Sequence, residues 1–452
     1  MTPDLAISLL KIVGSVLLLT GVLAGVGLLA RRLQLQAEIA RKIIHVSLGL
    51  YCLTFPWVFS HAWEVAAVCG LAGIVFVIAR GRPALGEGLH GVKRFSYGEL
   101  LFAVSVALLF WLKDGHYSLA VRGVQSEPQL ILYVLPLLLL TLCDAASALV
   151  GVNYGRMRFP VEEGVKSVEG VLTFVLTAWI TAMIALLLFT DLGRGDVIIL
   201  ALITALFGGL FEAASWRGLD NLFIPVGLYF ILSNLLPRGT AELLIITLAF
   251  AVTTGILTAV GVRMKLSRHV VASGLSLLFC IVIFAGPLAV LTPGAAFAAY
   301  YVVWRDGGRR EVPHDALNMM ITVLTVALSV FVISALLKID TIFMFNLAFA
   351  CLATGILVRF GSLGPVWLGS GIAWICVVGL VRTLAVPVWR PDTFLFAVFA
   401  VVLVVISAGL FRAMRDHWPD RPWIRLGALS LLIGLAGLPL SPHAWTPLGL
   451  SG

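Results

Sequence analysis

Long apolar runs separated by short polar stretches repeat along the chain, from about residue 6 to about residue 440. Many runs are about 20 residues long, the length that a helix needs to cross the hydrocarbon core of a bilayer. Because no water reaches that core, uninterrupted apolar runs should form helices. We therefore expect an all-α, polytopic transmembrane helical bundle of about 16 spans, about nine in the N-terminal half and about seven in the C-terminal half. The expected spans are 6–30, 43–60, 62–79, 99–112, 129–150, 168–190, 196–215, 221–236, 241–262, 270–288, 290–304, 316–337, 341–358, 364–381, 393–411 and 424–440.

Composition supports this interpretation and excludes other classes. Hydrophobic residues make up 60% of the 452 residues and charged residues 12%, against roughly 25% charged residues in a soluble domain. The net charge of +8 is spread over the ends of the apolar runs, so we expect contact with membrane lipids and none with nucleic acid. The six cysteines lie inside apolar stretches without a CxxC pair, which predicts neither disulfides nor a zinc site.

Basic residues predict the orientation of the chain in the membrane. They follow the odd-numbered spans, as in Arg31-Arg32, Lys93-Arg94 and Arg156–Lys166, whereas loops such as Lys113–Glu127 and Asp191–Asp196 are short or poor in basic residues. Under the positive-inside rule the odd-numbered exits are cytoplasmic, and both termini are expected outside.

Two polar groups interrupt the apolar pattern early in the chain. Arg41, Lys42 and His45 lie within two turns of one expected helix, where Arg41 and His45 share a face. The two cations could be ordinary interface anchors, and His45 could be a packed histidine or a functional one. Glu99 opens a later helix, where a carboxylate also suits the helix dipole.

Asp144 begins the richest polar stretch. It follows the apolar run Ile131–Cys143 with no adjacent cation, and placing a carboxylate there costs roughly 2.5–3.5 kcal/mol, so a partner or a cation is expected. Gly151 and Gly155 make the following helix approachable, either for a ligand or for a neighbouring helix.

The next segment contains parts that are suited to holding phosphates. Lys166, Ser167, Glu169 and Gly170 stand at the head of a helix, and glycines, a lysine, a hydroxyl and a helix N-terminus bind anions. The spacing differs from that of a P-loop, so the phosphate interpretation is generic at this level.

A second carboxylate without a local partner, Glu212, precedes Asp220-Asn221, a pair that is also typical of a helix N-cap. With Asp144 and Glu169, these side chains offer oxygen ligands that suit Mg²⁺ together with substrate phosphates. Since phosphoryl transfer depends on positioning and charge stabilisation, a metal, cations and one base would suffice for it.

Five motifs, in order between residues 38 and 225, resemble the family of phytol and dolichol kinases, which are membrane lipid-alcohol kinases. The family patterns are R-K-x-x-H-x-x-x-G, S-x-G-E, D-x-x-A-x-x-x-G-x-x-x-G, K-S-x-E-G and an E followed after several residues by D-N. They are met in turn by Arg41, Lys42, His45 and Gly49; by Ser96, Gly98 and Glu99; by Asp144, Ala148, Gly151 and Gly155; by Lys166, Ser167, Glu169 and Gly170; and by Glu212, Asp220 and Asn221. The resemblance implies CTP, or sometimes another pyrimidine nucleotide, as phosphate donor. It implies a lipid alcohol as acceptor, most often an isoprenoid alcohol such as phytol, farnesol, geranylgeraniol or a polyprenol, and in some members diacylglycerol.

The C-terminal half faintly resembles the phytyl-phosphate kinase family. In that family a stretch reads A-D-T-x-A-S-E-x-G, but here Thr354 stands in place of the Asp and Arg359 in place of the Glu. We therefore expect two transmembrane domains, a kinase-like domain at 1–240 and a degenerate second domain at 241–452.

The leading hypothesis is a CTP-dependent lipid-alcohol kinase that receives its nucleotide from the cytosol. A cytidylyltransferase acting on a lipid phosphate would use a similar site but release pyrophosphate. An ion-coupled transporter would favour inverted repeats with acids at the midplane, whereas these acids gather near one membrane face. The expected catalytic residues are Asp144, His45, Lys166 and Glu169; the expected phosphate-binding residues are Arg41, Lys42, Gly151, Gly155, Lys166, Ser167 and Gly170; the expected Mg²⁺ ligands are Asp144, Glu169, Glu212 and Asp220, with Glu99 and Asn221 as further site candidates.

Overall fold

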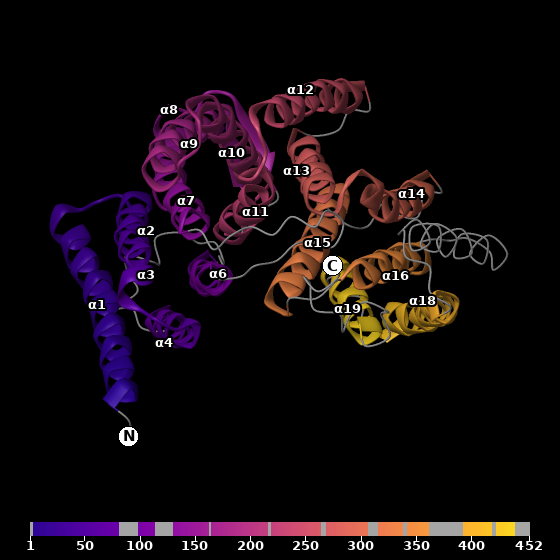
Figure 1. The fold of residues 1–452 in the computed structure, drawn as a ribbon, viewed down its shortest axis with the longest axis horizontal. Coiled ribbons are helices and arrows are strands. Elements are labelled where there is room, and N and C mark those ends of the chain that lie inside the picture. The colour runs from indigo at the N-terminus through magenta and orange to yellow at the C-terminus, as the bar shows by residue number, and fades with distance from the viewer. Residues whose placement is uncertain are drawn as a thin grey trace. The chain divides into compact units, whose positions relative to one another are not determined.

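The computed structural model describes residues 3–80, 98–113, 130–161, 164–215, 218–263, 268–305, 315–337, 341–360, 392–417 and 422–438 (Figure 1). Within these ranges nearly every residue lies in a helix, and the one sheet is a two-stranded ribbon. This confirms the all-α class. The chain divides into two compact units, and among the described residues the first ends at Ser276 and the second begins at Leu277.

Several helices are long and apolar enough to cross a bilayer. Seven meet this condition among the described residues, and further apolar helices of 10–17 residues accompany them. Large apolar side chains are exposed on several helices, for example Leu10 at 74%, Leu188 at 74% and Val262 at 75%. A surface of this kind marks contact with lipid, so the protein is an integral membrane protein. The expected total of about 16 spans is not confirmed, and the expected span 364–381 lies outside the described residues.

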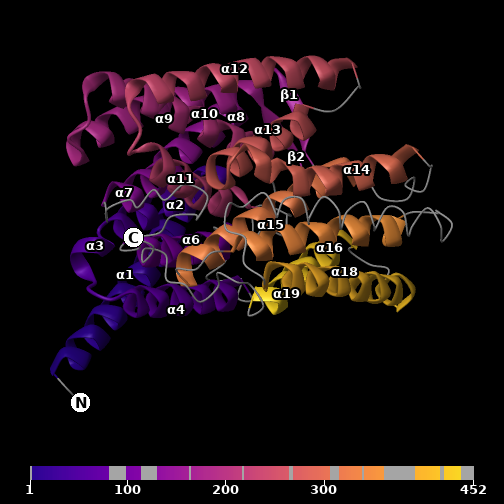
Figure 2. The same ribbon diagram turned by 45° about the vertical axis from the view of Figure 1, so that its right-hand side comes forward.

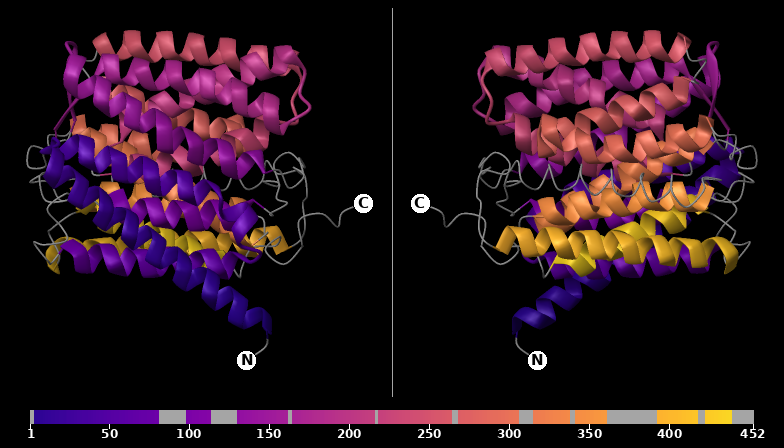
Figure 3. Two further views of the ribbon diagram at one scale, coloured as in Figure 1. Left: turned by 90° about the vertical axis from the view of Figure 1, so that its left-hand side faces the viewer. Right: turned by 90° about the vertical axis from the view of Figure 1, so that its right-hand side faces the viewer.

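The first unit contains most of the helices. They are α1 (Pro3–Leu33), α2 (Ala37–Leu53), α3 (Phe55–Val58), α4 (Ala62–Arg80), α6 (Gly98–Leu112), α7 (Ile131–Leu138), α8 (Asp144–Tyr154), α9 (Val168–Phe189), α10 (Arg194–Ala214), α11 (Asp220–Leu235), α12 (Thr240–Arg263) and α13 (Arg268–Ala285), of which α13 runs past the boundary at Ser276. Helices α9, α10 and α12 run side by side (Figures 2 and 3). Because α12 packs on α10, the compact unit extends beyond residue 240, while the expected functional division at residue 240 stays a prediction.

A π-helical turn, η1 (Leu139–Cys143), joins α7 to α8, so one continuous helical rod runs from Ile131 to Tyr154. The backbone N–H of Asp144 donates to the carbonyl of Leu139, five residues earlier. Pro136, one turn upstream, cannot donate a backbone hydrogen bond. Such π turns widen the helix, rotate the residues that follow and occur frequently at functional sites. Here the turn lies directly before Asp144.

The segment that we expected as a loop between α8 and α9 forms a hairpin. Strands β1 (Arg158–Val161) and β2 (Gly164–Ser167) pair antiparallel, with Lys166 opposite Phe159. Successive side chains of a strand point to opposite faces. Val165 is 58% exposed, whereas the Lys166 side chain is 18% exposed and turns toward the protein interior.

The second unit surrounds one buried helix. Helix α16 (Ile342–Phe360) contacts α14 (Leu291–Arg305), α15 (Asp315–Leu337), α18 (Asp392–His417) and α19 (Pro422–Gly437); a short 3₁₀ turn, η2 (Pro287–Val290), precedes α14. Thr354 lies on α16, fully buried, and its hydroxyl donates to the Ala350 carbonyl. The Thr354 hydroxyl therefore hydrogen-bonds its own helix.

The contact of α2 with the π turn gives a stability prediction. A Cβ added at Gly49 would overlap the Thr141 side chain, whereas a Cβ at Gly70 of α4 would meet nothing within 4 Å. We expect Gly49→Ala to destabilise the protein by roughly 1–3 kcal/mol, as overpacking does. Gly70→Ala, the matched control, should leave stability unchanged or raise it slightly. Thermal unfolding in detergent measures both, and equal effects of the two variants would contradict the close approach.

Candidate active site

A buried ion pair joins α2 to the start of α8. The Lys42 Nζ donates to Asp144 Oδ2 at 2.6 Å, and each residue is 5% exposed. The partner that the sequence required for Asp144 therefore comes from 102 positions earlier in the chain. A buried carboxylate without such a cation would be strongly unfavourable.

His45 lies one turn beyond Lys42 and contacts the same carboxylate. Its Nε2 lies 3.1 Å from the Leu140 carbonyl oxygen and 3.5 Å from Asp144 Oδ2. Because a carbonyl can only accept, Nε2 carries the proton and donates it to Leu140, a residue of the π turn. Carbonyls beside a π turn are open to donors from other elements. The imidazole is thus held with its N–H edge toward Leu140 and Asp144.

A second buried ion pair joins the hairpin to the end of α10. The Lys166 Nζ donates to Glu212 Oε1 at 2.9 Å and also to the Glu212 backbone carbonyl. Burial tends to lower the pKa of the Lys166 amine, but the negative charges of Glu212 and Asp220 outweigh it and raise the pKa overall. Lys166 is therefore cationic at neutral pH.

The two pairs converge on a cluster of three carboxylates. One oxygen each of Asp144, Glu212 and Asp220 lies within 4.8 Å of the others. Glu212 is 7% exposed, and among the described residues its Oε2 is buried with no hydrogen-bond partner. Oxygen donors at this spacing, one of them unsatisfied, fit a hard divalent cation such as Mg²⁺. The donor set therefore agrees with a metal held by these three residues.

Glu169 lies outside this cluster. Both of its carboxylate oxygens accept from the Met157 backbone N–H, at 2.9 and 3.2 Å. The acidic group within the described residues comprises Asp144, Glu212 and Asp220, so the geometry gives no support to the expected metal role of Glu169. The hydrogen bond from Met157 to Glu169 instead ties the first turn of α9 to the short segment between α8 and β1.

The glycines expected to bind phosphate pack against one another and against Ser167. A Cβ at Gly155 would lie 2.7 Å from the Ser167 Cβ, and one at Gly170 would lie 3.3 Å from the Gly151 Cα. The Ser167 Oγ accepts from the Gly170 N–H at 3.1 Å and caps α9. The small residues therefore allow close packing of α8 on α9, and their expected role in phosphate binding stays a prediction.

Arg41 lies at the edge of the site. Its guanidinium donates to both oxygens of Glu38, at 3.2 and 2.6 Å, and its side chain is 40% exposed. Burial opposes the charged form, but Glu38 and, more weakly, Asp144 and Asp220 raise the Arg41 pKa. Glu38 was not among the expected site residues, although its position three residues before Arg41 on a helix is the signal that predicts such a pair.

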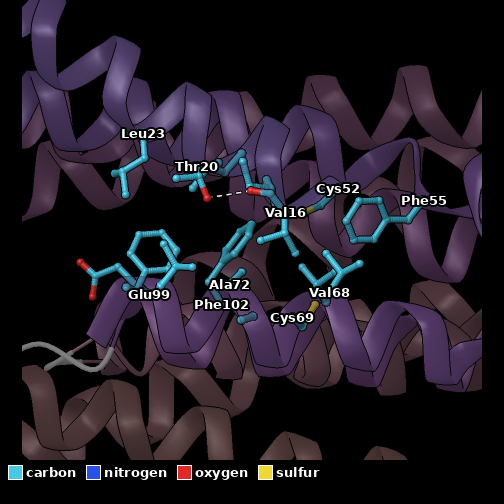
Figure 4. A pocket seen from close by; sticks show the side chains of 16 residues that line it. Val16, Thr20, Leu23, Cys52, Phe55, Val68, Cys69, Ala72, Glu99 and Phe102 are labelled. Carbon is cyan, nitrogen blue, oxygen red and sulfur yellow. Dashed lines mark hydrogen bonds between the residues drawn. The ribbon is translucent and has the colours of Figure 1, made fainter. Parts of the chain in front are cut away.

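Asn221 and Glu99 lie on neighbouring helices. The Asn221 side-chain amide donates to the Gly98 carbonyl at 3.0 Å, and the Asn221 backbone carbonyl accepts from the Ser105 hydroxyl at 2.6 Å. Asn221 thereby fixes the start of α11, and hence Asp220, against α6. Glu99 follows Gly98 and lines an apolar cavity (Figure 4) rather than the carboxylate cluster.

Comparison with known proteins gives one relative. Over 200 residues the chain is 32% identical to the phytol kinase of Synechocystis sp. (strain ATCC 27184 / PCC 6803 / Kazusa), a match that covers 44% of this chain and 80% of that protein. No family model matches the chain. No solved structure matches it either.

The Lys42–Asp144 pair gives a second prediction. Lys42→Met leaves Asp144 buried without its cation, and we expect it to cost roughly 3–5 kcal/mol of unfolding free energy. The double variant Lys42→Met/Asp144→Leu should lose less than Lys42→Met alone. Glu242→Gln, which breaks the Arg238–Glu242 pair at its 62% exposed member, is the control and should cost less than about 1 kcal/mol. Additive losses in the double variant, measured by unfolding in detergent, would show that the two groups are uncoupled.

Proposed function

The chain belongs to the phytol kinase family, and from this premise we propose that its first unit transfers the γ-phosphoryl group of CTP to the hydroxyl of an isoprenoid alcohol. Family membership supports a kinase that acts on a lipid alcohol. The choice of CTP and of an isoprenoid acceptor rests on the five motifs. The observation that carries the proposal is the convergence of two lysines, one histidine and three carboxylates from five separate segments.

Asp144, Glu212 and Asp220 would hold the divalent cation, and their oxygen donors and the unsatisfied Glu212 Oε2 support this assignment. When bound, Mg²⁺ neutralises charge on the nucleotide phosphates and orients them. The carboxylates are fixed before substrate binds, because Lys42 and Lys166 already hold two of them. Such preorganisation is the main contribution that a protein makes to phosphoryl transfer.

The cations have separate tasks in this scheme. Lys166 lies on strand β2, and its pKa is raised. Its amine would contact the transferred phosphoryl group in addition to Glu212. Arg41, which is 40% exposed, is accessible to the outer phosphates of a nucleotide arriving from water. Lys42 is fully engaged with Asp144 and acts as a positioning residue.

Asp144 and His45 would receive the acceptor hydroxyl. The alcohol oxygen forms a bond to the γ-phosphorus, the bond from that phosphorus to the β–γ bridging oxygen breaks, and CDP leaves. The hydroxyl proton passes to the Asp144 carboxylate, and a loose transition state requires little of this base. The His45 imidazole, which is held beside this carboxylate by its hydrogen bond to the Leu140 carbonyl, would line the position of the hydroxyl.

A nucleotide from the cytosol requires the hairpin and the carboxylate cluster to face the cytoplasm. The distribution of basic residues favours that orientation. The alcohol would reach the same cluster laterally from the bilayer.

The proposal is tested with purified protein in detergent, Mg²⁺, γ-labelled CTP or ATP and a panel of lipid alcohols. We expect label from CTP in an isoprenoid phosphate, and a loss of at least about 100-fold in Asp144→Asn. Asp191→Asn changes an exposed carboxylate and should keep wild-type activity. Pyrophosphate release with a lipid phosphate would identify a cytidylyltransferase instead. No product in either assay, from protein shown to be folded, would contradict both the kinase and the cytidylyltransferase hypotheses.

Two glutamate variants compare Glu212, a metal ligand that the geometry favours, with Glu169, which was expected from the sequence but lies outside the carboxylate cluster. Glu212→Gln should raise the Mg²⁺ concentration for half-maximal rate by at least about tenfold, because it removes one charged ligand. Glu169→Gln should leave the Mg²⁺ requirement unchanged, since that side chain holds the Met157 N–H. Mg²⁺ titrations of the transfer rate measure both. If Glu169→Gln raised the Mg²⁺ requirement and Glu212→Gln did not, Glu169 would be the metal ligand and Glu212 would not.

A further inference from the structure

The C-terminal end of α10, which carries Glu212, is held by side chains from several segments. The last four carbonyls of an α-helix have no partner within the helix. In α10 three of them accept hydrogen bonds from side chains: the Phe211 carbonyl from the Ser215 hydroxyl at 2.6 Å, the Glu212 carbonyl from Lys166, and the Ala214 carbonyl from His269 at 2.7 Å. The end of this helix is therefore fixed by the residue that follows it, by the ribbon and by α13.

His269 is the donor that α13 contributes. It is the second residue of α13 and lies 55 positions beyond Ala214 in the chain, yet it is only 2% exposed. Because a carbonyl can only accept, the His269 Nε2 carries the proton of this hydrogen bond. A buried carbonyl that loses its donor is strongly unfavourable, so the imidazole and the end of α10 are held together.

Apolar contacts place α13 against both sides of the Lys166–Glu212 ion pair. Ala272 of α13 packs against the buried side chains of Phe159 and Ala213. Phe159 lies opposite Lys166 in the ribbon, and Ala213 is the residue after Glu212. Figure 2 shows the ribbon next to α13. The helix therefore contacts the two elements that the ion pair joins.

The position of the Glu212 carboxylate depends on this end of α10. One of its oxygens lies within 4.8 Å of oxygens of Asp144 and Asp220, and its Oε2 is buried without a hydrogen-bond partner among the described residues. Mg²⁺ demands nearly ideal octahedral geometry, so a small shift of one ligand weakens its binding. Removing a group that orients a metal ligand typically lowers metal affinity about 10–100-fold.

We propose that His269 is a positioning residue for Glu212, and that the kinase-like part of the chain extends beyond the five motifs into the first turns of α13. The inference rests on the proposed function, because it assigns His269 to the metal site of that function. His269 acts through the backbone of α10 and not on the reacting groups. By fixing the Ala214 carbonyl, it keeps the Glu212 carboxylate beside the other two carboxylates of the cluster.

Binding of Mn²⁺ to the full-length protein, followed by electron paramagnetic resonance, tests this role without any need for catalysis. His269→Leu removes the donor and should weaken Mn²⁺ binding about tenfold or more. His269→Gln keeps an N–H donor on a side chain of similar reach and should bind Mn²⁺ nearly as tightly as wild type. Ser276→Ala is the matched control, because it removes a buried hydroxyl that donates to the Ala272 carbonyl within α13. It should keep the wild-type affinity.

Hydrogen exchange in the metal-free protein measures the hold of His269 on α10 directly. The amides in the last turn of α10 should exchange about fivefold faster in His269→Leu than in wild type, the effect of one lost hydrogen bond. The amides in the middle of α9 should exchange at wild-type rates, which shows in the same experiment that the variant is folded. His269→Gln should restore the slow exchange at the end of α10.

The outcomes keep the failure of this role apart from the failure of the kinase. Weaker Mn²⁺ binding in His269→Leu that His269→Gln restores would support the positioning role, even if no lipid alcohol is phosphorylated. Equal Mn²⁺ affinity in wild type and His269→Leu would overturn it, whether or not the end of α10 exchanges faster, and would leave the kinase intact. An equal loss of affinity in Ser276→Ala would also overturn it, because the effect would then come from general damage to α13.

Discussion

The burial of Asp144 is the constraint on which the first unit depends. A carboxylate in an apolar interior is tolerated only with a cation and further hydrogen bonds. Lys42 supplies the cation, so α2 must lie against the junction of the π turn and α8. Gly49 permits that approach at Thr141, and the same approach places His45 between the Leu140 carbonyl and the carboxylate. The position of α2 and the identity of the candidate catalytic residues thus have one physical cause.

A second pair, Lys166 with Glu212, repeats this arrangement from the other side of the cluster. Asp220 brings a third carboxylate, and Asn221 fixes its helix against α6. Three carboxylates this close repel one another unless cations balance them. Two lysines and a metal would provide that balance, and an incoming phosphate would be met by charges that are already in place.

The sequence predicted the helical class because apolar runs of span length have few alternatives in a membrane. It also identified Asp144 and Glu212 as carboxylates in need of partners, but not which partners, since the ion pairs join positions 102 and 46 residues apart. The π turn has no local sequence signal beyond Pro136. Glu169 was expected at the metal as one of four carboxylates with oxygen ligands that suit Mg²⁺, whereas in the structure its carboxylate accepts from the Met157 N–H, a contact that joins positions 12 residues apart. The span count could not be predicted because several helices, such as α6 and α11, are shorter than a full crossing.

Direct detection of the metal tests the central claim that these buried carboxylates form a site for a divalent cation. Manganese, which takes the same oxygen ligands as Mg²⁺, can be titrated into the purified protein and followed by electron paramagnetic resonance. The account predicts one tightly bound Mn²⁺ per chain, with its affinity strongly reduced in both Asp144→Asn and Glu212→Gln. Binding that is equally tight in both variants and in wild type would contradict the assignment of the cluster.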